Sequence, residues 1–337
     1  MKYRLLPIKA RCPLCGFDEG LLLYEVESEK VSQFFAPADL KKEDNLKINR
    51  EIESLWPEKR CKIIRCKKCS LCYAFPFKAG TSNFYSILYS NLQYSAWKKE
   101  YDLSLKEIKK IAEKNQDLKY LEIGAGNGNF AEAVSSYIKK KNILCLEYSD
   151  HSCKEINNKG IKCRGCGLLE LDSSKKYDII CLFQVLEHLD NLDKFFKKIM
   201  DISEKNAEVI ITVPDESNIS FCEQRLGFMD YPPNHISRWN LKSFNFVSKK
   251  FGFKIIGYKK FRNSYFSLLR DVAFGRYTMD NSDEKKMANK VSLIKLKNPK
   301  SGKILKGFML VYYLVTSLFL MPKNKIYSFQ WVHLRKV

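Results

Sequence analysis

One stretch of the sequence, YLEIGAGNGNF, places three glycines at alternate positions directly after an apolar run. Gly124, Gly126 and Gly128 leave the backbone bare, which is typical of a turn that a ligand approaches closely. The fingerprint of a dinucleotide site would place its third glycine where this chain has Asn129. Such a site also has no need of an acid two positions before the first glycine, where this chain has Glu122. The stretch therefore indicates a turn for a different ligand.

A second acidic residue, Glu147, ends the next predicted strand, NILCLEYS, and its carboxylate can accept hydrogen bonds from both vicinal hydroxyls of a ribose. EIGAGNG, this acid and the sequence VLEHL follow one another in the order and at the spacing of the class I S-adenosylmethionine (SAM) methyltransferases, which the chain resembles. The resemblance implies that the turn approaches the methionine moiety and ribose of SAM. It also implies that Glu122 orients the ammonium group, directly or through water, and that Glu147 binds the ribose.

The same resemblance assigns residues around the third and fourth predicted strands. The aspartate that commonly contacts the adenine amine in this family is replaced here by Gly167. That contact would therefore come from the backbone around Leu168 or from Asp172. Just past the fourth strand, Phe183 and Gln184 are expected to line the cofactor and the mouth of the substrate site.

Two cysteine pairs near the start of the chain, CPLC and CKKC, have the spacing of a metal site. Two residues between thiolates allow one tight turn to present both sulfurs to the same tetrahedral ion, and two such turns complete four ligands. The predicted metal ligands are Cys12, Cys15, Cys66 and Cys69. Their flanks resemble a zinc ribbon, which implies a structural zinc ion, and Cys61 and Cys72 are close enough in sequence to substitute for a ligand.

The remaining cysteines are interpreted without metal. Cys163 and Cys166 form a third C-x2-C pair, with Cys153 nearby, and we interpret them as small buried hydrophobes because the end of a strand rarely forms a metal-binding turn. The chain has 12 cysteines, and its start lacks an apolar signal segment. A reducing compartment, by default the cytoplasm, is therefore expected, where paired cysteines more often hold metal than form disulfides.

Candidates for a catalytic base are few, because the chain has four histidines. His235, in PPNHISRW, follows the fifth predicted strand, where this fold builds the acceptor pocket, and an imidazole suits deprotonation of a sugar hydroxyl near neutral pH. A loop histidine that caps the backbone is the alternative. His188, in LEHL, is the second candidate, with packing and orientation as its alternative role. Glu223 and Arg225 are expected to bind a sugar or phosphate from the same wall.

Alternating strands and helices would bring these residues together. Strands are predicted at 119–123, 143–147, 161–164, 177–183, 208–213 and 253–258. Segments of helical period lie between them, which predicts a parallel sheet with helices on both faces and ligands at the carboxyl ends of its strands. Together with the resemblance, the pattern predicts a Rossmann-like α/β fold with the seven-stranded methyltransferase sheet and a small N-terminal zinc ribbon.

Three regions are predicted: a zinc ribbon (1–80), a methyltransferase core (81–265) and a C-terminal extension (266–337) with an apolar helix (304–322) and the last strand of the sheet (325–336). The uncharged part of that helix would measure about 24 Å, short of the roughly 30 Å hydrocarbon core of a membrane. A helix lying in the membrane interface and flanked by lysines is one interpretation. Burial against the domain or in a dimer interface is the other.

The chain has 337 residues and a formal net charge of +21, which suits a phosphorylated substrate, an anionic membrane or nucleic acid, or simply solvated helix faces. The arrangement of ribbon and glycine turn resembles bacterial methyltransferases of sugar and surface-polysaccharide pathways. It implies O-methylation of a free or lipid-linked sugar, in the cytoplasm or peripherally at the inner face of the membrane. An RNA methyltransferase or a non-catalytic membrane-peripheral scaffold are the alternatives. RNA is disfavoured because aromatic residues do not interleave with lysine and arginine in one patch. The oligomeric state is left open.

Overall fold

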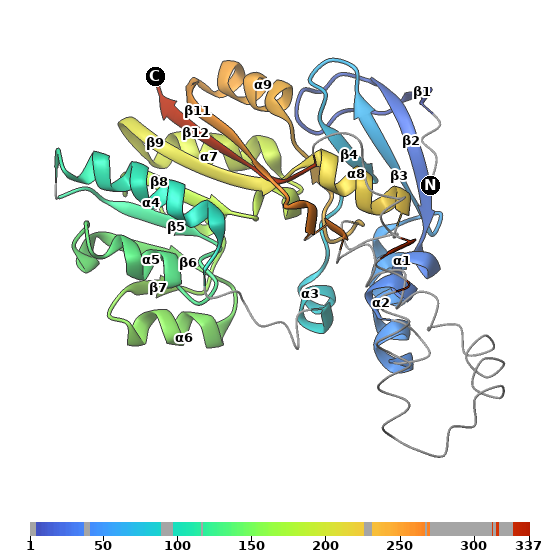
Figure 1. The fold of residues 1–337 in the computed structure, drawn as a ribbon, viewed down its shortest axis with the longest axis horizontal. Coiled ribbons are helices and arrows are strands. Elements are labelled where there is room, and N and C mark those ends of the chain that lie inside the picture. Colours follow the sequence, from blue (N-terminus) through green and yellow to red (C-terminus); the bar gives the residue numbers. More distant parts are fainter. Residues whose placement is uncertain are drawn as a thin grey trace.

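The computed structural model contains two sheets that lie beside each other (Figure 1). It describes residues 5–36, 41–88, 97–115, 117–225, 231–266, 268–269, 312, 315–316 and 326–337, without the side chains of 222–225. The five-stranded sheet contains the N-terminal strands and lies at the right in Figure 1. The larger body to its left is built on the seven-stranded sheet.

The smaller sheet has the order β1-β2-β3-β4-β10. Its strands are β1 (Leu6–Lys9), β2 (Glu19–Glu27), β3 (Arg60–Cys66), β4 (Cys72–Phe75) and β10 (Ser237–Arg238). Helices α1 (Ser28–Phe35) and α2 (Lys42–Leu55) occupy the long connection between β2 and β3, and they pack with Trp56 and Ile63 in one buried cluster. The fifth strand comes from far along the chain, so the smaller sheet is completed by a segment that follows β9 of the larger one.

The larger sheet has the order β11-β12-β9-β8-β5-β6-β7. Its strands are β5 (Tyr120–Ile123), β6 (Ile143–Leu146), β7 (Lys162–Arg164), β8 (Tyr177–Phe183), β9 (Ser203–Pro214), β11 (Phe253–Arg262) and β12 (Tyr327–Lys336). Strands β5 to β9 are parallel, and β12 runs antiparallel to both of its neighbours, β9 and β11. The predicted fold class, a seven-stranded methyltransferase sheet, is confirmed.

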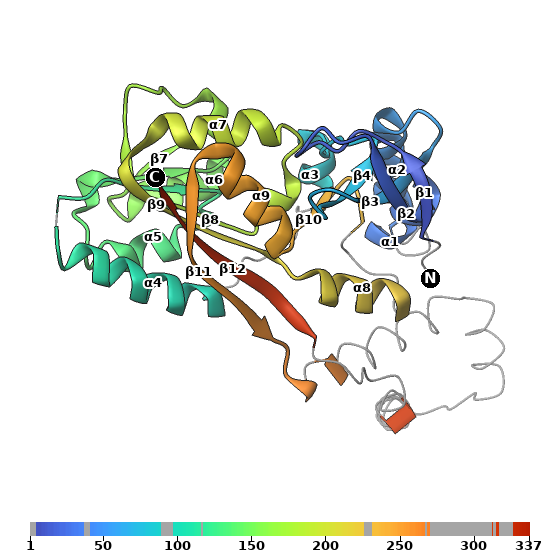
Figure 2. The same ribbon diagram turned by 90° about the horizontal axis from the view of Figure 1, so that it is seen from above.

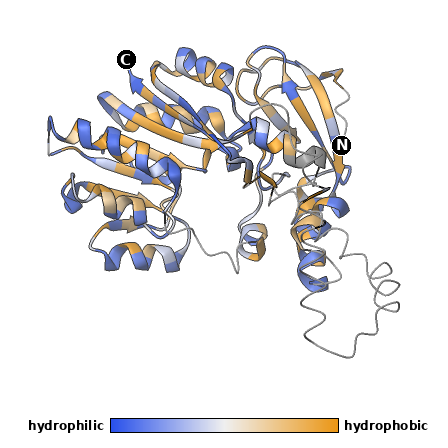
Figure 3. Ribbon diagram, viewed as in Figure 1, coloured by the Kyte–Doolittle hydropathy of each residue, from blue (hydrophilic) through white to orange (hydrophobic). Residues whose placement is uncertain are grey.

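Helices cover both faces of this sheet. Their bounds are α4 (Lys99–Ala112), α5 (Asn129–Val134), α6 (Asp150–Asn158), α7 (Leu192–Ile202) and α9 (Leu241–Phe251). Helices α4, α5 and α6 share one buried cluster with the sheet, and α7 and α9 share the other; Figure 2 shows α4 and α7 on opposite sides. Every residue of β5 and β6 is buried, as expected of strands covered on both faces, and Figure 3 shows hydrophobic residues along the central strands.

Some elements differ from the sequence pattern. The segment 129–141 has helical period, yet α5 ends at Val134 and is followed by turns and a short 3-10 helix, η1 (Lys140–Asn142). The hydroxyl of Ser135 donates to the carbonyl of Glu132 at 2.6 Å, and such local bonds compete with continuation of a helix. The remaining elements are α3 (Ser82–Leu88), α8 (Glu216–Arg225), η2 (Leu168–Glu170) and η3 (Leu186–His188).

The interpretation of Cys153 and Cys163 as unlinked small hydrophobes is wrong. The two residues form a disulfide with their Cα atoms 5.4 Å apart, whereas Cys166 is free. The reason is tertiary, because α6 returns alongside β7 and so brings two residues that are ten positions apart into bonding distance.

The predicted apolar helix, 304–322, lies outside the described residues apart from 312 and 315–316. In the part of the chain that the structure does describe, no helix is both long and apolar enough to cross a membrane.

Candidate cofactor and acceptor site

The three glycines form a turn that requires glycine. Gly124, Gly126 and Gly128 have φ angles of +69°, +54° and +70°, in the left-handed region that side chains disfavour. A Cβ atom on Gly124 would lie 2.6 Å from Cγ2 of Val185, and one on Gly128 would lie 2.6 Å from Cγ1 of Ile156. The turn thus packs its backbone tightly between β5 and the start of α5, at the carboxyl edge of the sheet.

Glu147, which follows β6, lies against this turn. Its Oε2 atom accepts a hydrogen bond from the backbone N–H of Gly126 at 2.8 Å, and its Oε1 atom accepts one from Ser149 at 3.2 Å. The side chain is half-buried. The structure therefore brings the acid predicted for the ribose into contact with the glycine turn.

Glu122 is buried inside β5, with 1% of its surface exposed. The Tyr120 hydroxyl donates to its Oε2 atom at 3.0 Å. Burial raises the pKa of Glu122 to about 8, although the hydrogen bond from Tyr120 and the charge of Lys98 act in the opposite direction. A buried carboxyl group whose ionisation is disfavoured gains from a cation beside it, and this fits the ammonium group of SAM.

Glu100 is a second buried acid near the turn, and the sequence analysis missed it. It is 5% exposed, burial raises its pKa, and it shares a hydrogen bond with Gln184. A sequence signal did exist, because Glu100 occupies the same helical stripe of α4 as the buried residues Ser104 and Ile108. An acid in an otherwise apolar stripe is a candidate for function.

The residue after β8, Gln184, has a strained backbone. Its φ angle is +59°, rare for a residue with a side chain, and its backbone N–H donates to Thr212 at 3.0 Å. Phe183 precedes it, and its ring centroid lies 4.6 Å from that of Phe130 and 4.9 Å from that of Tyr101. Strain of this kind concentrates at functional sites. That Phe183 and Gln184 line the cofactor stays a prediction.

The region predicted to contact adenine contains an aromatic residue that the sequence analysis did not single out. A Cβ atom on Gly167 would lie 2.1 Å from the hydroxyl oxygen of Tyr148, which directly follows Glu147 and is 74% exposed. Leu168 is buried, whereas Asp172 is exposed and accepts from the backbone N–H of Ser174 at 3.0 Å, within its own turn. Tyr148 therefore occupies the space that a side chain at position 167 would need.

The two candidate histidines meet at the carboxyl end of β8. Their ring centroids are 4.6 Å apart, with His188 in η3 and His235 in the loop after cis-Pro233. The Nδ1 atom of His188 lies 2.7 Å from the backbone oxygen of Asn234 and 3.5 Å from the Tyr85 hydroxyl. The structure thus brings the two histidines together, and the catalytic role of either one stays a prediction.

Backbone hydrogen bonds fix the loop that carries His235. Ile236 donates to the carbonyl of Glu187 in η3 at 2.9 Å, while its own carbonyl accepts from Ala74 at 2.9 Å. The carbonyl of Pro233 accepts from Gly80 at 3.1 Å. The loop is thus held on one side by the larger sheet and on the other by the smaller sheet.

The four predicted metal ligands form a cluster in the smaller sheet. Their ligand atoms, the sulfurs of Cys12, Cys15, Cys66 and Cys69, all lie within 4.8 Å of one another. The Cys12–Cys69 and Cys15–Cys66 sulfur distances are 3.6 Å and 3.4 Å, close to the roughly 3.8 Å between sulfurs of a tetrahedral zinc site. Backbone N–H groups of Lys68 and Cys69 point at the Cys66 sulfur at 3.4 Å and 3.5 Å. The geometry fits a structural zinc ion.

The other two histidines lie away from this edge. His151 is exposed in α6, whereas His333, in β12, is buried and pairs with Glu208 at 2.5 Å. The side chains of Glu223 and Arg225, predicted to bind a sugar or phosphate, lie outside the described part of the chain.

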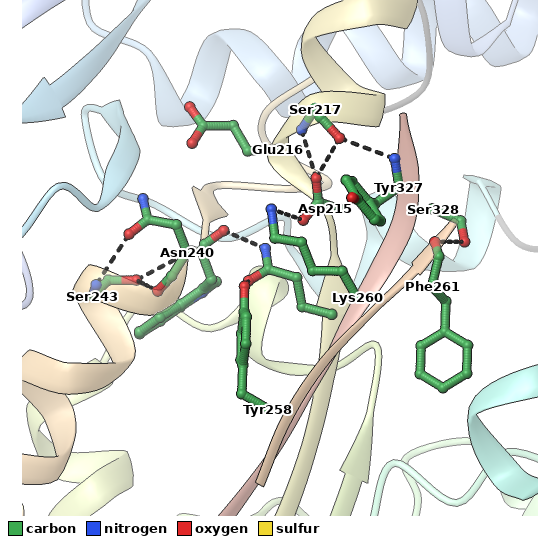
Figure 4. Close-up of polar contacts among 12 residues, drawn as sticks. Asp215, Glu216, Ser217, Asn240, Ser243, Tyr258, Lys260, Phe261, Tyr327 and Ser328 are labelled. Carbon is green, nitrogen blue, oxygen red and sulfur yellow. Dashed lines mark hydrogen bonds and ion pairs between the residues drawn. The ribbon is translucent and has the colours of Figure 1, made fainter. Parts of the chain in front are cut away.

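A polar network anchors the carboxyl end of β9 (Figure 4). Asp215 is fully buried and forms an ion pair with Lys260 of β11 at 2.8 Å. It also accepts from the backbone of Ser217 at 2.9 Å, and the Ser217 hydroxyl in turn accepts from Tyr327 at 3.1 Å. The next residue, Glu216, pairs with Arg65 of β3, so the same corner connects the two sheets.

One family model matches the central part of the chain. Residues 96–257 match a family model described as a methyltransferase domain. No curated protein matches the chain. The matched residues include the glycine turn, the acids of β5 and β6 and both candidate histidines.

Several solved structures resemble the chain at low identity. The YcgJ protein of Bacillus subtilis is 14% identical with a TM-score of 0.45, over 70% of this chain and 98% of that one. Coclaurine N-methyltransferase bound to N-methylheliamine and SAH is 12% identical with a TM-score of 0.43, over 73% of this chain and 74% of that one. The cyclopropane synthase MmaA2 of Mycobacterium tuberculosis is 12% identical with a TM-score of 0.44, over 72% and 90%.

Proposed function

We propose that this protein is a SAM-dependent methyltransferase and that it methylates a hydroxyl group of a sugar in the synthesis of a surface glycan or related small molecule. The observation that carries the proposal is the position of the histidine pair. His188 follows β8, whose neighbour β5 leads into the glycine turn, so both sites open at the carboxyl edge of one parallel sheet. The sugar as acceptor comes from the resemblance to ribbon-bearing methyltransferases.

The residues around the glycine turn fit SAM. The backbone of the turn would approach the methionine moiety, Glu122 would face the ammonium group and Glu147 the ribose hydroxyls. The buried, proton-retaining state of Glu122 suits a cationic ligand, and the contact of Glu147 with Gly126 keeps its carboxylate at the turn. Leu168, with the exposed ring of Tyr148 nearby, would border the adenine. When bound, SAM supplies a methyl group on a sulfonium that a nucleophile displaces directly.

On the acceptor side, the protein's task is to align a hydroxyl group and to receive its proton. An imidazole is suited to accept that proton near neutral pH, and His235 is the candidate. His188 would orient it, since the Nδ1 atom of His188 is bound to the backbone of the preceding residue, Asn234, at 2.7 Å. Alignment of the two reacting groups contributes much of the rate in a displacement of this kind.

The cysteine cluster is proposed to hold zinc with a structural role. Four sulfur ligands fill a tetrahedral ion, so no position remains for a substrate. The ribbon's importance for the reaction would lie in β4, which pairs with β10 directly after His235.

The acceptor in this proposal is a free or lipid-linked sugar, and the place of action is the cytoplasm or the inner face of the membrane. The net charge of +21 is compatible with an anionic, phosphate-bearing acceptor. Nucleic acid is the alternative acceptor, and salt-sensitive binding and methylation of RNA would favour it.

The test is calorimetric titration of SAM and S-adenosylhomocysteine into the zinc-loaded protein. Wild-type protein should bind with micromolar affinity, and Glu147→Ala should weaken binding at least about tenfold, because charge-assisted hydrogen bonds contribute roughly 1.5–3 kcal/mol. His151→Ala, at an exposed position, is the matched control and should bind like the wild type. Absence of binding by folded protein would leave the non-catalytic scaffold. Methyl transfer is then measured with labelled SAM on sugar nucleotides, lipid-linked sugars and RNA.

A further inference from the structure

A second group of metal-ligating side chains lies on the acceptor side. Glu187, His188 and His235 each offer one ligand atom, and these atoms all lie within 4.8 Å of one another. Two of the residues come from η3 at the end of β8, and the third comes from the loop after cis-Pro233. Glu187 is 1% exposed, and both of its carboxylate oxygens are shielded from solvent.

We propose that these three side chains bind a divalent transition-metal cation. Two imidazoles and one carboxylate suit zinc, iron, manganese or cobalt, and such a set leaves coordination positions open. The cysteine cluster differs, because its four thiolates would occupy all coordination positions of a tetrahedral ion. The chain would thus carry one closed site in the ribbon and one open site beside the cofactor turn.

The surroundings of His188 support a ligand role. Its Nδ1 atom lies 2.7 Å from the carbonyl oxygen of Asn234, so Nδ1–H donates to the backbone and Nε2 keeps the lone pair. Metal-binding histidines are commonly oriented by such a bond from the other ring nitrogen to a carbonyl oxygen. The same short segment holds the third ligand, because His235 follows Asn234 directly.

The backbone around the ligands is also fixed from both sheets. Ile236 donates to the carbonyl of Glu187 at 2.9 Å, and this connects the two segments that carry the ligands. Burial of the Glu187 carboxylate adds an electrostatic reason, since a carboxylate removed from water is stabilised by a cation close to it.

The role of this cation in the reaction rests on the proposed function. Oxygen atoms of the acceptor would complete the coordination shell, and a hydroxyl bound to the cation loses its proton more readily. In the transfer, the sulfonium–methyl bond breaks, the oxygen–methyl bond forms and the hydroxyl proton passes to solvent water. His235 then acts as a ligand and not as the base. An acceptor with two adjacent oxygens is favoured, because it fills two open positions.

The experiment is a titration of Co²⁺ into the full-length chain, purified without a histidine tag and loaded with zinc at the cysteines. The wild type should bind one further equivalent with the weak visible absorption of cobalt on nitrogen and oxygen ligands. Cobalt at the cysteines would instead produce an intense near-ultraviolet thiolate band, so the two sites are distinguished. Glu187→Gln and His235→Asn should each weaken the new site at least about tenfold, and His151→Asn should leave it unchanged.

Folding of each variant is checked by its SAM affinity, since the buried Glu187 is sensitive to substitution and the half-buried His235 less so. Two results would overturn the cation site: no cobalt beyond the cysteine site, or undiminished binding in both variants. If SAM binds and cobalt does not, the cation site alone is contradicted, and His235 is again the candidate base. If cobalt binds and SAM does not, the proposed function is lost instead.

Discussion

At the scale of single residues, we expect cofactor binding to depend on pH through Glu122. Its pKa is raised to about 8 by burial, so the carboxyl group carries a proton at neutral pH in the free protein. A cationic ligand favours the ionised form, and binding below this pKa must therefore release the proton. SAM affinity should rise with pH up to about 8, by at most about tenfold per pH unit.

This dependence is measured by calorimetry between about pH 6 and pH 8 in two buffers of different ionisation enthalpy, which also counts the protons released. Glu122→Gln should bind more weakly and lose most of the dependence. A wild-type affinity that does not change with pH, or a dependence retained in Glu122→Gln, would contradict this assignment.

The same carboxyl group also affects stability. A folded-state pKa above the unfolded value means that the folded protein binds the extra proton, so this contribution to stability is complete below the unfolded pKa of about 4.3. It is lost as pH rises through the folded pKa, which lies at about 8. The cofactor-free protein is thus more stable when Glu122 is protonated. At higher pH, a bound cofactor would offset the loss of this contribution to the free energy of unfolding.

Gly124 illustrates how backbone conformation determines the turn. Replacement by alanine adds a Cβ atom 2.6 Å from Cγ2 of Val185 at a φ angle of +69°. We expect Gly124→Ala to lower the free energy of unfolding by about 1–3 kcal/mol and to weaken SAM binding. Gly165→Ala is the matched control, because its Cβ would lie 3.8 Å from the nearest atom, Oδ1 of Asp150, and should cost little. Denaturant unfolding and titration measure both effects, and equal losses in the two variants would contradict the argument.

At the scale of elements, the loop that carries His235 is joined to the smaller sheet by strand pairing. In β10, Ser237 pairs with Tyr73 of β4, directly after the loop that carries His235. Residues that belong to the larger sheet and its helices also contact both cysteine turns. Lys250 donates to the carbonyl of Leu14 at 2.9 Å, and the Asn240 amide donates to the carbonyl of Ser70 at 2.8 Å. The smaller sheet therefore supports the loop that carries His235, whereas the glycine turn belongs to the larger sheet.

Loss of a metal from the cysteine cluster should reduce methyl transfer without reducing SAM binding. Cys69→Ser is expected to lower zinc content and methyl transfer, while SAM affinity stays within about twofold. The reason is that backbone N–H groups of the glycine turn bond to Leu146 and Glu147, in and directly after β6 of the larger sheet, whereas the cysteine cluster lies in the smaller one. Cys181→Ser, in the middle of β8, is a control for loss of a buried thiol without metal. Elemental analysis, calorimetry and transfer rates measure the outcome. If SAM affinity falls together with zinc content, the cysteine cluster also affects the cofactor side, and this prediction is wrong.

At the scale of the whole molecule, the C-terminal strand β12 is inserted between β9 and β11 of the larger sheet. Burial acts to raise the pKa of Glu208 in β9, yet hydrogen bonds from His333 and Arg335 in β12 outweigh it and lower the pKa. A lowered pKa means that this contribution to stability is present above the unfolded pKa of about 4.3 and is lost as pH falls through the folded value.

Glu208→Gln should therefore reduce the free energy of unfolding by about 1–3 kcal/mol near neutral pH, and by less in acid, where the wild type has lost the same interaction. Denaturant unfolding across this range is the measurement. Glu204→Gln, in the half-exposed part of the same strand, serves as the control. A constant difference between Glu208→Gln and wild type at all pH values would show that packing, and not charge, is responsible.

Local patterns in the sequence, together with the family resemblance, predicted the larger sheet and the positions of the glycine turn and its neighbouring acids. Buried runs such as YLEI and ILCL have the length and composition of strands covered on both faces, and the glycines and acids at their ends lie within a few residues of them. Because side chains at the carboxyl ends of neighbouring parallel strands share one edge, the order of the strands already predicts that Glu147 meets the turn. The spacing of the cysteine pairs likewise predicted the four-sulfur cluster.

Contacts between distant segments were decided only by the tertiary structure. The approach of His235 to Glu187 and His188 depends on the loop that joins β10 to the ribbon sheet, and no periodicity records such a pairing. The disulfide between Cys153 and Cys163 depends on how α6 returns to β7. The sequence by itself determined most strands of the larger sheet and the positions of the glycines and acids at their ends, since both follow from neighbouring residues, whereas SAM as the ligand follows from the family resemblance. The acceptor side was determined by packing between two sheets, where the interacting residues are far apart in the chain.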